Sequence, residues 1–226
     1  MSTDATGLPS DAAGLVNRGI ENATTAVSTV GARHVRSQDE RLTLVATRMT
    51  IVSMTFFFVC FYFALFYLQL INANGQWLPP GVDHPASWLG VAEVALVVVA
   101  GLVYFWGQWA GLYAGKMERL QIGVSVAALL CVVASVLHIA ELHAPGFTLQ
   151  GGGYVSVFVA LEGTFTVILI LTTIVALGMA NRARLGLFAR SGIAVEAFGE
   201  YLGWIAAIAV INFLALYVQP FIQTAG

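Results

Sequence analysis

Residues 151–177 read GGGYVSVFVALEGTFTVILILTTIVAL, an almost unbroken apolar run that contains one acidic residue, Glu162. From Tyr154 to Met179 the run is long enough for a helix, which rises about 1.5 Å per residue, to cross about 30 Å of hydrocarbon. An ionised carboxyl deep in such a helix costs roughly 2 to 3.5 kcal/mol. The run therefore predicts a membrane-spanning helix in which Glu162 is neutral, has a partner or faces a wet space.

The composition of the whole chain extends this prediction to the rest of the molecule. Of the 226 residues, 58% are hydrophobic and only 10% are charged, whereas about 25% of the residues of a soluble domain are charged. Backbone amides in lipid must be satisfied within their own segment, which favours helices. We predict an all-α, polytopic membrane helix bundle over residues 43–226, with five transmembrane helices at about 49–71, 88–113, 122–141, 154–179 and 198–221.

The basic residues predict the direction of these helices. All ten fall before the first apolar window or in the second and fourth connections, and none falls in the first or third connection. The positive-inside rule then makes the N-terminus cytoplasmic and the C-terminus external. Residues 1–42 are predicted to be a cytoplasmic N-terminal arm with one short surface helix, and plain disorder fits the same residues equally well.

Histidines and cysteines are too few for a redox centre within the chain. The four histidines are His34, His84, His138 and His143, whereas haem or copper sites in a bundle need several imidazole ligands. Cys60 and Cys131 lie in apolar runs, where a thiol stays neutral and packs. We therefore expect no catalytic site and no bound cofactor in this chain, and no nucleic-acid partner.

Three ionisable residues fall at comparable depths in the outer halves of the predicted helices. Glu93, His138 and Glu162 are expected to form an intramembrane polar cluster, to which Glu141 and His143 lie close in sequence. One interpretation is that each acid is neutral and hydrogen-bonded to a neighbouring helix. A second is an ion or proton site, since intramembrane acids are commonly functional. A third is a metal site, because His138 and Glu141 share a helix face, with Glu93 and Glu162 as further candidate ligands.

Several motifs occur in the order seen in a known family. WLPPG at 77–81 is followed by LQIGVSVAALL at 120–130, GGYVSVFVALEGTF at 152–165 and RLGLFARSGIAVEAFGEYLGW at 184–204. Together, from about Thr47 to Val218, they resemble subunit III of the haem-copper (cytochrome c or quinol) oxidases, in a divergent five-helix bacterial form. The positions that match the family are Trp77, Pro79, Pro80, Gly81, Gly163, Glu196 and Tyr201.

The sequence also departs from the family pattern. Met54 replaces an acid that the family usually carries, Phe165 and Ile168 stand where two histidines are expected, and Glu162 replaces a threonine. These departures put in doubt any role in proton uptake that the family assigns to those polar groups.

The resemblance implies a function for the chain. It implies a non-catalytic accessory subunit in the bacterial cytoplasmic (inner) membrane that stabilises the catalytic subunit I and binds phospholipid. Haem and copper would belong to the partner, in a cytochrome c oxidase or a related nitric oxide reductase system. Two alternatives stay open: a small ion or proton transporter that uses Glu93, His138 and Glu162, and a structural subunit of another membrane complex.

Overall fold

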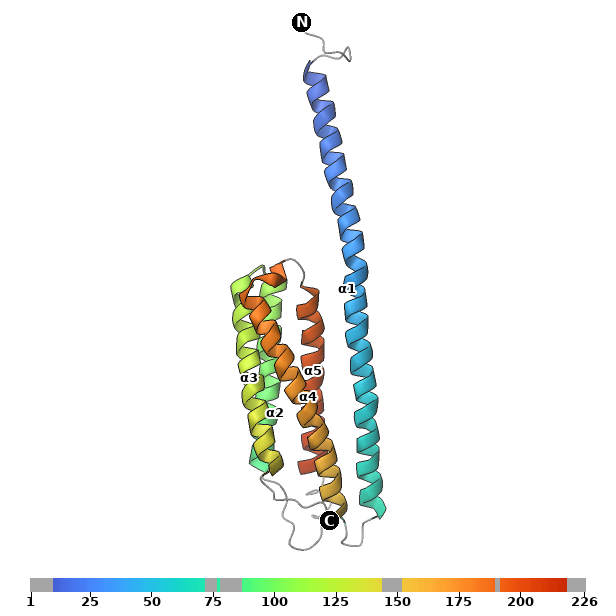
Figure 1. Cartoon of the computed structure of the whole chain (residues 1–226), viewed down its shortest axis with the longest axis vertical. Coiled ribbons are helices and arrows are strands. Elements are labelled where there is room, and N and C mark those ends of the chain that lie inside the picture. Colours follow the sequence, from blue (N-terminus) through green and yellow to red (C-terminus); the bar gives the residue numbers. More distant parts are fainter. Residues whose placement is uncertain (1–9, 72–76, 78–86, 144–151, 190–191, 219–226) are drawn as a thin grey trace. The chain divides into compact units, whose positions relative to one another are not determined.

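The structure, a computed structural model, describes residues 10–71, 77, 87–143, 152–189 and 192–218. Every regular element in these ranges is helical, and none is a strand (Figure 1). The elements are α1 (Ser10–Ile71), α2 (Ser87–Leu112), α3 (Met117–His143), α4 (Gly152–Arg184), the short helix η1 (Leu187–Ala189), α5 (Ile193–Phe213) and its π-helical continuation η2 (Leu214–Val218).

Five of these helices are long and apolar enough to cross a membrane. The spans are Arg41–Ile71, Trp88–Leu112, Met117–His143, Gly152–Arg184 and Ile193–Val218. The prediction of an all-α, multi-pass membrane bundle with five spanning helices is confirmed. The helices extend beyond several predicted windows, because flanking polar residues such as Glu118 and Arg182 lower the local hydropathy without ending the helix.

The chain divides into two compact units, residues 1–45 and 46–226. In the first unit, α1 already begins at Ser10, so the helix there is longer than the one short helix that the sequence predicts. The rest of the description concerns residues 46–226.

Helices α2 and α3 pack closely because glycines face each other. A Cβ atom added at Gly123 would lie 2.6 Å from the Cα of Gly107, closer than real Cβ atoms approach a backbone. Ala127, Ala128 and Cys131 of α3 lie in one buried cluster with Ala100 and Tyr104 of α2. All five are almost fully buried. Small side chains let helix backbones come close together in a membrane bundle, where packing replaces the hydrophobic effect as the source of association.

Helix α1 packs against α5 through a few side chains. The rings of Phe58 and Trp204 meet edge to face with centroids 6.1 Å apart, and the Trp204 Nε1–H donates a 2.9 Å hydrogen bond to Thr55. The guanidinium of Arg48 donates two hydrogen bonds to the carboxylate of Glu200, 2.9 and 2.7 Å long. These contacts bring one side of α1 to the bundle and fix its rotation about its axis.

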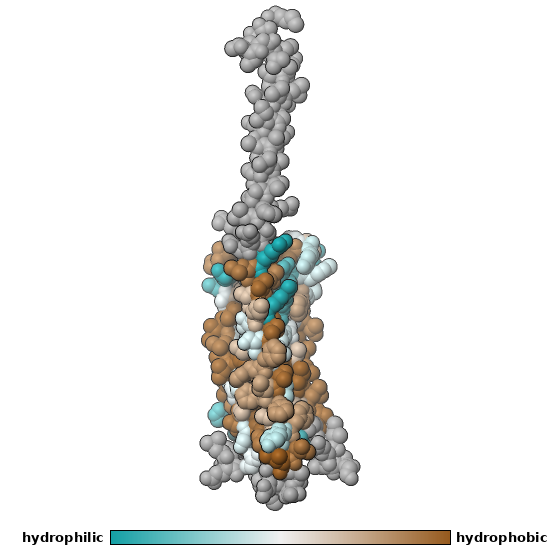
Figure 2. Space-filling model, turned by 90° about the vertical axis from the view of Figure 1, so that its right-hand side faces the viewer, coloured by the Kyte–Doolittle hydropathy of each residue, from teal (hydrophilic) through white to brown (hydrophobic). Residues whose placement is uncertain are grey.

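The other side of α1 remains uncovered within residues 46–226. Phe56, Phe63 and Leu70 are each more than two thirds exposed and recur every seven residues, so they share one face. Figure 2 shows one face of the molecule, on which apolar residues cover most of the coloured surface. Such a surface suits lipid or another membrane protein.

Basic residues gather at one end of the bundle. The connection between α2 and α3 carries Lys116, and α4 ends with Arg182 and Arg184. Residues of these two regions line one shallow pocket, which includes Met117 and Phe188, so the two connections meet at the same end. The polar cluster described next lies toward the opposite ends of α3 and α4.

Candidate functional site

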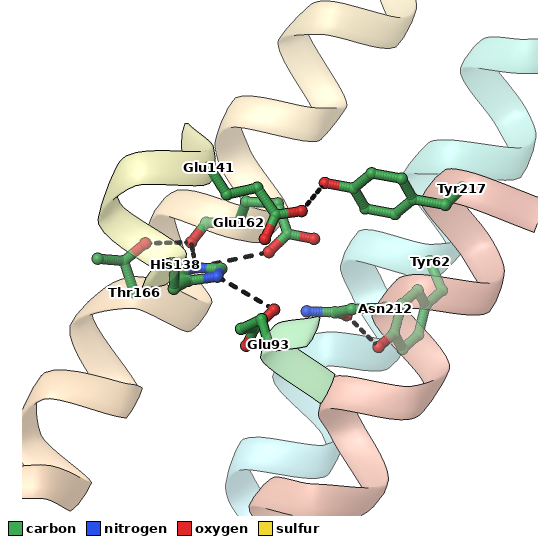
Figure 3. Close-up of polar contacts among 8 residues, drawn as sticks. All are labelled: Tyr62, Glu93, His138, Glu141, Glu162, Thr166, Asn212 and Tyr217. Atoms are coloured by element: carbon green, nitrogen blue, oxygen red, sulfur yellow. Dashed lines mark hydrogen bonds and ion pairs between the residues drawn. The ribbon is translucent and has the colours of Figure 1, made fainter. Parts of the chain in front are cut away.

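Four ionisable side chains from three helices meet inside the bundle (Figure 3). Glu93 comes from α2, His138 and Glu141 from α3, and Glu162 from α4. Their exposed fractions are 5%, 1%, 3% and 5%, so all four are buried. The structure thus brings together the three residues of the predicted cluster and adds Glu141 to them.

His138 lies at the centre and contacts two acids with opposite edges of its ring. Its Nδ1 is 3.3 Å from Glu93 Oε2, and its Nε2 is 3.6 Å from Glu162 Oε2. The Nε2 atom is also 3.2 Å from the backbone carbonyl oxygen of Glu162, which accepts a further hydrogen bond from Thr166. The imidazole therefore links α2 to α4 through the middle of the bundle.

Glu141 is held on the other side of the cluster by α5. The hydroxyl of Tyr217 donates a hydrogen bond to Glu141 Oε1. This oxygen also lies where a larger side chain at Gly90 would be, because a Cβ added there would be 3.0 Å from it. The absence of a side chain at Gly90 on α2 is thus what allows Glu141 to approach.

The end of α5 widens into a π-helical turn, Leu214–Val218, and this turn supplies Tyr217. Such turns leave carbonyl groups without their usual helical partners. Here the hydroxyl of Tyr154 donates a 2.9 Å hydrogen bond to the carbonyl oxygen of Leu216. Asn212, one turn earlier, accepts a 2.6 Å hydrogen bond from Tyr62 of α1. All five spanning helices therefore reach the site.

Several buried polar atoms of the site have no hydrogen-bond partner among the described residues. They are Glu93 Oε1, Glu141 Oε2, Asn212 Nδ2 and His138 Nδ1, which is within ion-pair distance of Glu93 Oε2 but makes no hydrogen bond. An adjoining pocket, lined by Glu93, Glu162 and Asn212 among others, is too narrow to hold a water molecule. Unpartnered polar atoms are costly in a dry interior. The atoms of the described residues therefore leave several polar groups of the site without a hydrogen bond.

The arrangement can hold a proton or a cation. One ligand atom each from Glu93, His138 and Glu141 can be chosen so that all three lie within 4.8 Å of one another. His143, which the sequence also places near the cluster, is instead exposed, and its Nδ1 lies 2.8 Å from the carbonyl oxygen of Ile139.

The described positions that match the family pattern contribute no side chain to the cluster, and the others lie outside the described residues. Trp77 packs edge to face on Tyr154, with ring centroids 5.8 Å apart, and its carbonyl oxygen accepts a hydrogen bond from the Tyr154 amide. Glu196 lies in the first turn of α5, and Tyr201 stacks at a tilt on Trp204. Gly163 of α4 has open space beside it. Pro79, Pro80 and Gly81 lie outside the described residues.

The residues that depart from the family pattern fill apolar positions. Phe165 is buried and meets the His138 ring edge on at 5.3 Å, so it covers one side of the cluster. Ile168 is buried in the same core, against which Met54 of α1 packs. These three side chains offer no polar atom to the site except the weakly accepting sulfur of Met54.

Sequence reasoning missed three residues of the site: Tyr62, Asn212 and Tyr217. Asn212 had a signal, because it is an amide within the long apolar run of the last span. The two tyrosines gave no such signal, because tyrosine is amphipathic and is expected near the ends of spanning helices, whatever its contacts.

No protein-family model matches this chain, and a search of the curated proteins finds no significant match. The resemblance to oxidase subunit III therefore rests on the sequence motifs alone.

Proposed function

We propose that this chain is a non-catalytic accessory subunit of a respiratory haem-copper oxidase in the bacterial cytoplasmic membrane. The observation that carries the proposal is the uncovered aromatic face of α1. Phe56, Phe63 and Phe66 are 68%, 71% and 54% exposed, although α1 packs against α5 on its other side. Aromatic side chains are enriched at protein interfaces, where they bury a large area at a low conformational cost.

The buried side chains of the bundle favour an accessory role over a redox role. His138 is the single imidazole buried among the described side chains, and acidic groups occupy both edges of its ring. Haem and copper centres in a bundle need several imidazoles. In this proposal they belong to a histidine-rich catalytic subunit I, and the exposed apolar surface of this chain holds phospholipid and that subunit.

The proposal is tested by purifying the tagged chain from its native membrane in mild detergent. We expect a large, histidine-rich membrane protein and its haem absorption bands to co-purify. A colourless chain that remains stable without partners would contradict the proposal.

Paired variants make this test specific to α1. The double variant Phe56→Ala/Phe63→Ala removes two rings from the uncovered face and is expected to lower partner recovery at least about tenfold, in line with the loss of two large contact residues. Leu129→Ala/Val136→Ala on α3 is the control, because these side chains are 62% and 63% exposed and have the same spacing. Equal recovery with both variants would place the partner elsewhere.

Ion or proton transport is the second candidate function, and the meeting of four ionisable side chains favours it. A transport path would have to continue toward the basic end, where the buried polar side chains of the described helices include Ser135, Thr172 and Thr173. In liposomes, ion flux through the unmodified chain that is lost in Glu93→Gln and Glu162→Gln would support this candidate. The lack of any flux would exclude it.

A further inference from the structure

We propose that Glu93, His138 and Glu141 bind a divalent transition-metal ion that ties α2 to α3 inside the bundle. This inference does not depend on the proposed function, because it concerns atoms within this chain alone. It goes beyond the metal candidates of the sequence, since the geometry selects three ligands, a histidine tautomer and supporting residues.

The distances between the three ligands suit a small ion. Their ligand atoms lie within 4.8 Å of one another. Zinc binds histidine nitrogen and carboxylate oxygen tetrahedrally at about 2.0 to 2.2 Å, which puts neighbouring ligand atoms about 3.3 to 3.6 Å apart. His138 Nδ1 and Glu93 Oε2 are 3.3 Å apart. For an ion to bind all three ligands, the glutamate side chains must turn toward it, because the ligand atoms spread over up to 4.8 Å.

The surroundings of His138 prepare its Nδ1 atom for a metal. Its Nε2 faces the carbonyl oxygen of Glu162 at 3.2 Å and Glu162 Oε2 at 3.6 Å. With its proton on Nε2, the imidazole donates to the carbonyl oxygen of Glu162 and keeps the lone pair on Nδ1. Metal-binding histidines generally donate their other ring N–H to a carboxylate or carbonyl in this way. Glu162 is thus a positioning residue for the imidazole.

The atoms that have no partner point to a missing cation. With the lone pair on Nδ1, this atom and Glu93 Oε2 are two acceptors that face each other at 3.3 Å. Glu93 Oε1 and Glu141 Oε2 also have no hydrogen-bond partner among the described residues, and both side chains are at least nine-tenths buried. A divalent ion between two carboxylates satisfies these atoms and brings their summed charge to zero.

The ligand types select the class of ion. An imidazole together with carboxylates suits zinc, manganese or iron, whereas calcium and magnesium prefer sites built from oxygen alone. The adjoining pocket is too narrow for a water molecule. A fourth ligand can therefore come from Glu93 itself, whose Oε1 is unpartnered and allows both oxygens to bind. Tyr217 supports the site by holding Glu141 through a hydrogen bond.

Metal binding by the purified full chain tests the proposal. The chain, carrying an affinity tag without histidine, is treated with a chelator, dialysed and given Zn²⁺. We expect about one zinc ion per chain by elemental analysis and a higher thermal unfolding midpoint. Co²⁺ in place of zinc is expected to give visible absorption bands of a bound ion. An unmodified chain that retains neither metal and shows no shift in the midpoint would overturn the proposal.

Matched variants identify the ligands. Glu93→Gln, Glu141→Gln and His138→Gln are expected to abolish the zinc-dependent shift, and the two glutamine replacements of glutamate preserve side-chain size. Tyr217→Phe is expected to weaken binding by about 10- to 100-fold, as the loss of a supporting contact does. His143→Gln is the control, since His143 lies on the same helix but is exposed, and it should bind zinc normally. Loss of binding in the control, or full binding in Glu93→Gln, would overturn the assignment.

Discussion

At the scale of single residues, the contact between Tyr217 and Glu141 shows how a buried acid is accommodated. The tyrosine hydroxyl donates to one carboxyl oxygen, and the ring of Tyr217 in η2 packs against Phe158 of α4 and Phe213 of α5. Removing the donor leaves the acid in an apolar interior without its hydrogen bond. The cost of such a loss exceeds the net value of the bond, because water cannot replace the donor.

We predict that Tyr217→Phe lowers the free energy of unfolding by about 1 to 3 kcal/mol in the metal-free protein, as for other buried groups left unsatisfied. Thermal unfolding in detergent, with a chelator present, measures this. Tyr113→Phe is the control, because the side chain of Tyr113 is 70% exposed and its loss of a hydroxyl should change stability little. Equal effects of the two substitutions would contradict the prediction.

Phe165 covers one side of the cluster with an apolar ring. It stands where the resemblance to subunit III expects a histidine, and its ring covers the edge of His138 at 5.3 Å. A ring that excludes water strengthens the electrostatic contacts of the imidazole with its acidic neighbours. Among the described residues, the buried acidic and imidazole side chains are thus concentrated in one cluster.

At the scale of helices, the fit of α2 to α3 depends on glycine. Gly107 and Gly123 face each other, and a Cβ on either would come within 3 Å of the backbone of the other. This contact sets the distance between the helix that carries Glu93 and the helix that carries His138 and Glu141. The geometry of the site therefore depends on residues four turns away from it.

We predict that Gly123→Ala destabilises the protein by about 1 to 3 kcal/mol, since the added methyl group overpacks a contact between two backbones. Gly178→Ala on α4 is the matched control, because nothing lies within 4 Å of its added Cβ. The control should be neutral or stabilising by up to about 1 kcal/mol, through the better helix propensity of alanine. Denaturation of both variants in the same detergent decides the prediction, which fails if Gly123→Ala is as stable as Gly178→Ala.

At the scale of the whole molecule, the distribution of basic residues within 46–226 gives the bundle two different ends. Arg119 and Arg182 lie at one end with Lys116, and the cluster of buried acids lies toward the other. On the positive-inside rule we predict that the basic end faces the cytoplasm, which would put the cluster nearer the external surface.

We predict that a cysteine placed at Lys116 reacts with a membrane-impermeant maleimide only after cells are permeabilised, whereas one placed at Thr224 reacts in intact cells. The measurement uses a chain in which the exposed Cys60 is replaced by Ser, so that the introduced thiol is the reactive one. The reverse labelling pattern would show that the predicted topology is inverted, with the cluster nearer the cytoplasm.

The sequence alone was sufficient for the helices and for part of the site. Five apolar runs predicted five spanning helices, because lipid constrains each segment locally in length and composition. The positions of Glu93, His138 and Glu162 along their helices followed from the same windows. The predicted ends were less accurate, since polar residues such as Glu118 continue α3 past its apolar window.

The number of spanning helices and the position of each ionisable residue along its helix were thus determined by the sequence itself, since both depend on local stretches of chain. Only the tertiary structure decided which polar atoms meet. That outcome depends on the rotation of each helix about its axis, on the glycine contact between α2 and α3, and on the π-helical turn that brings Tyr217 to Glu141. Side-chain packing between distant segments sets these features, and no single segment encodes them.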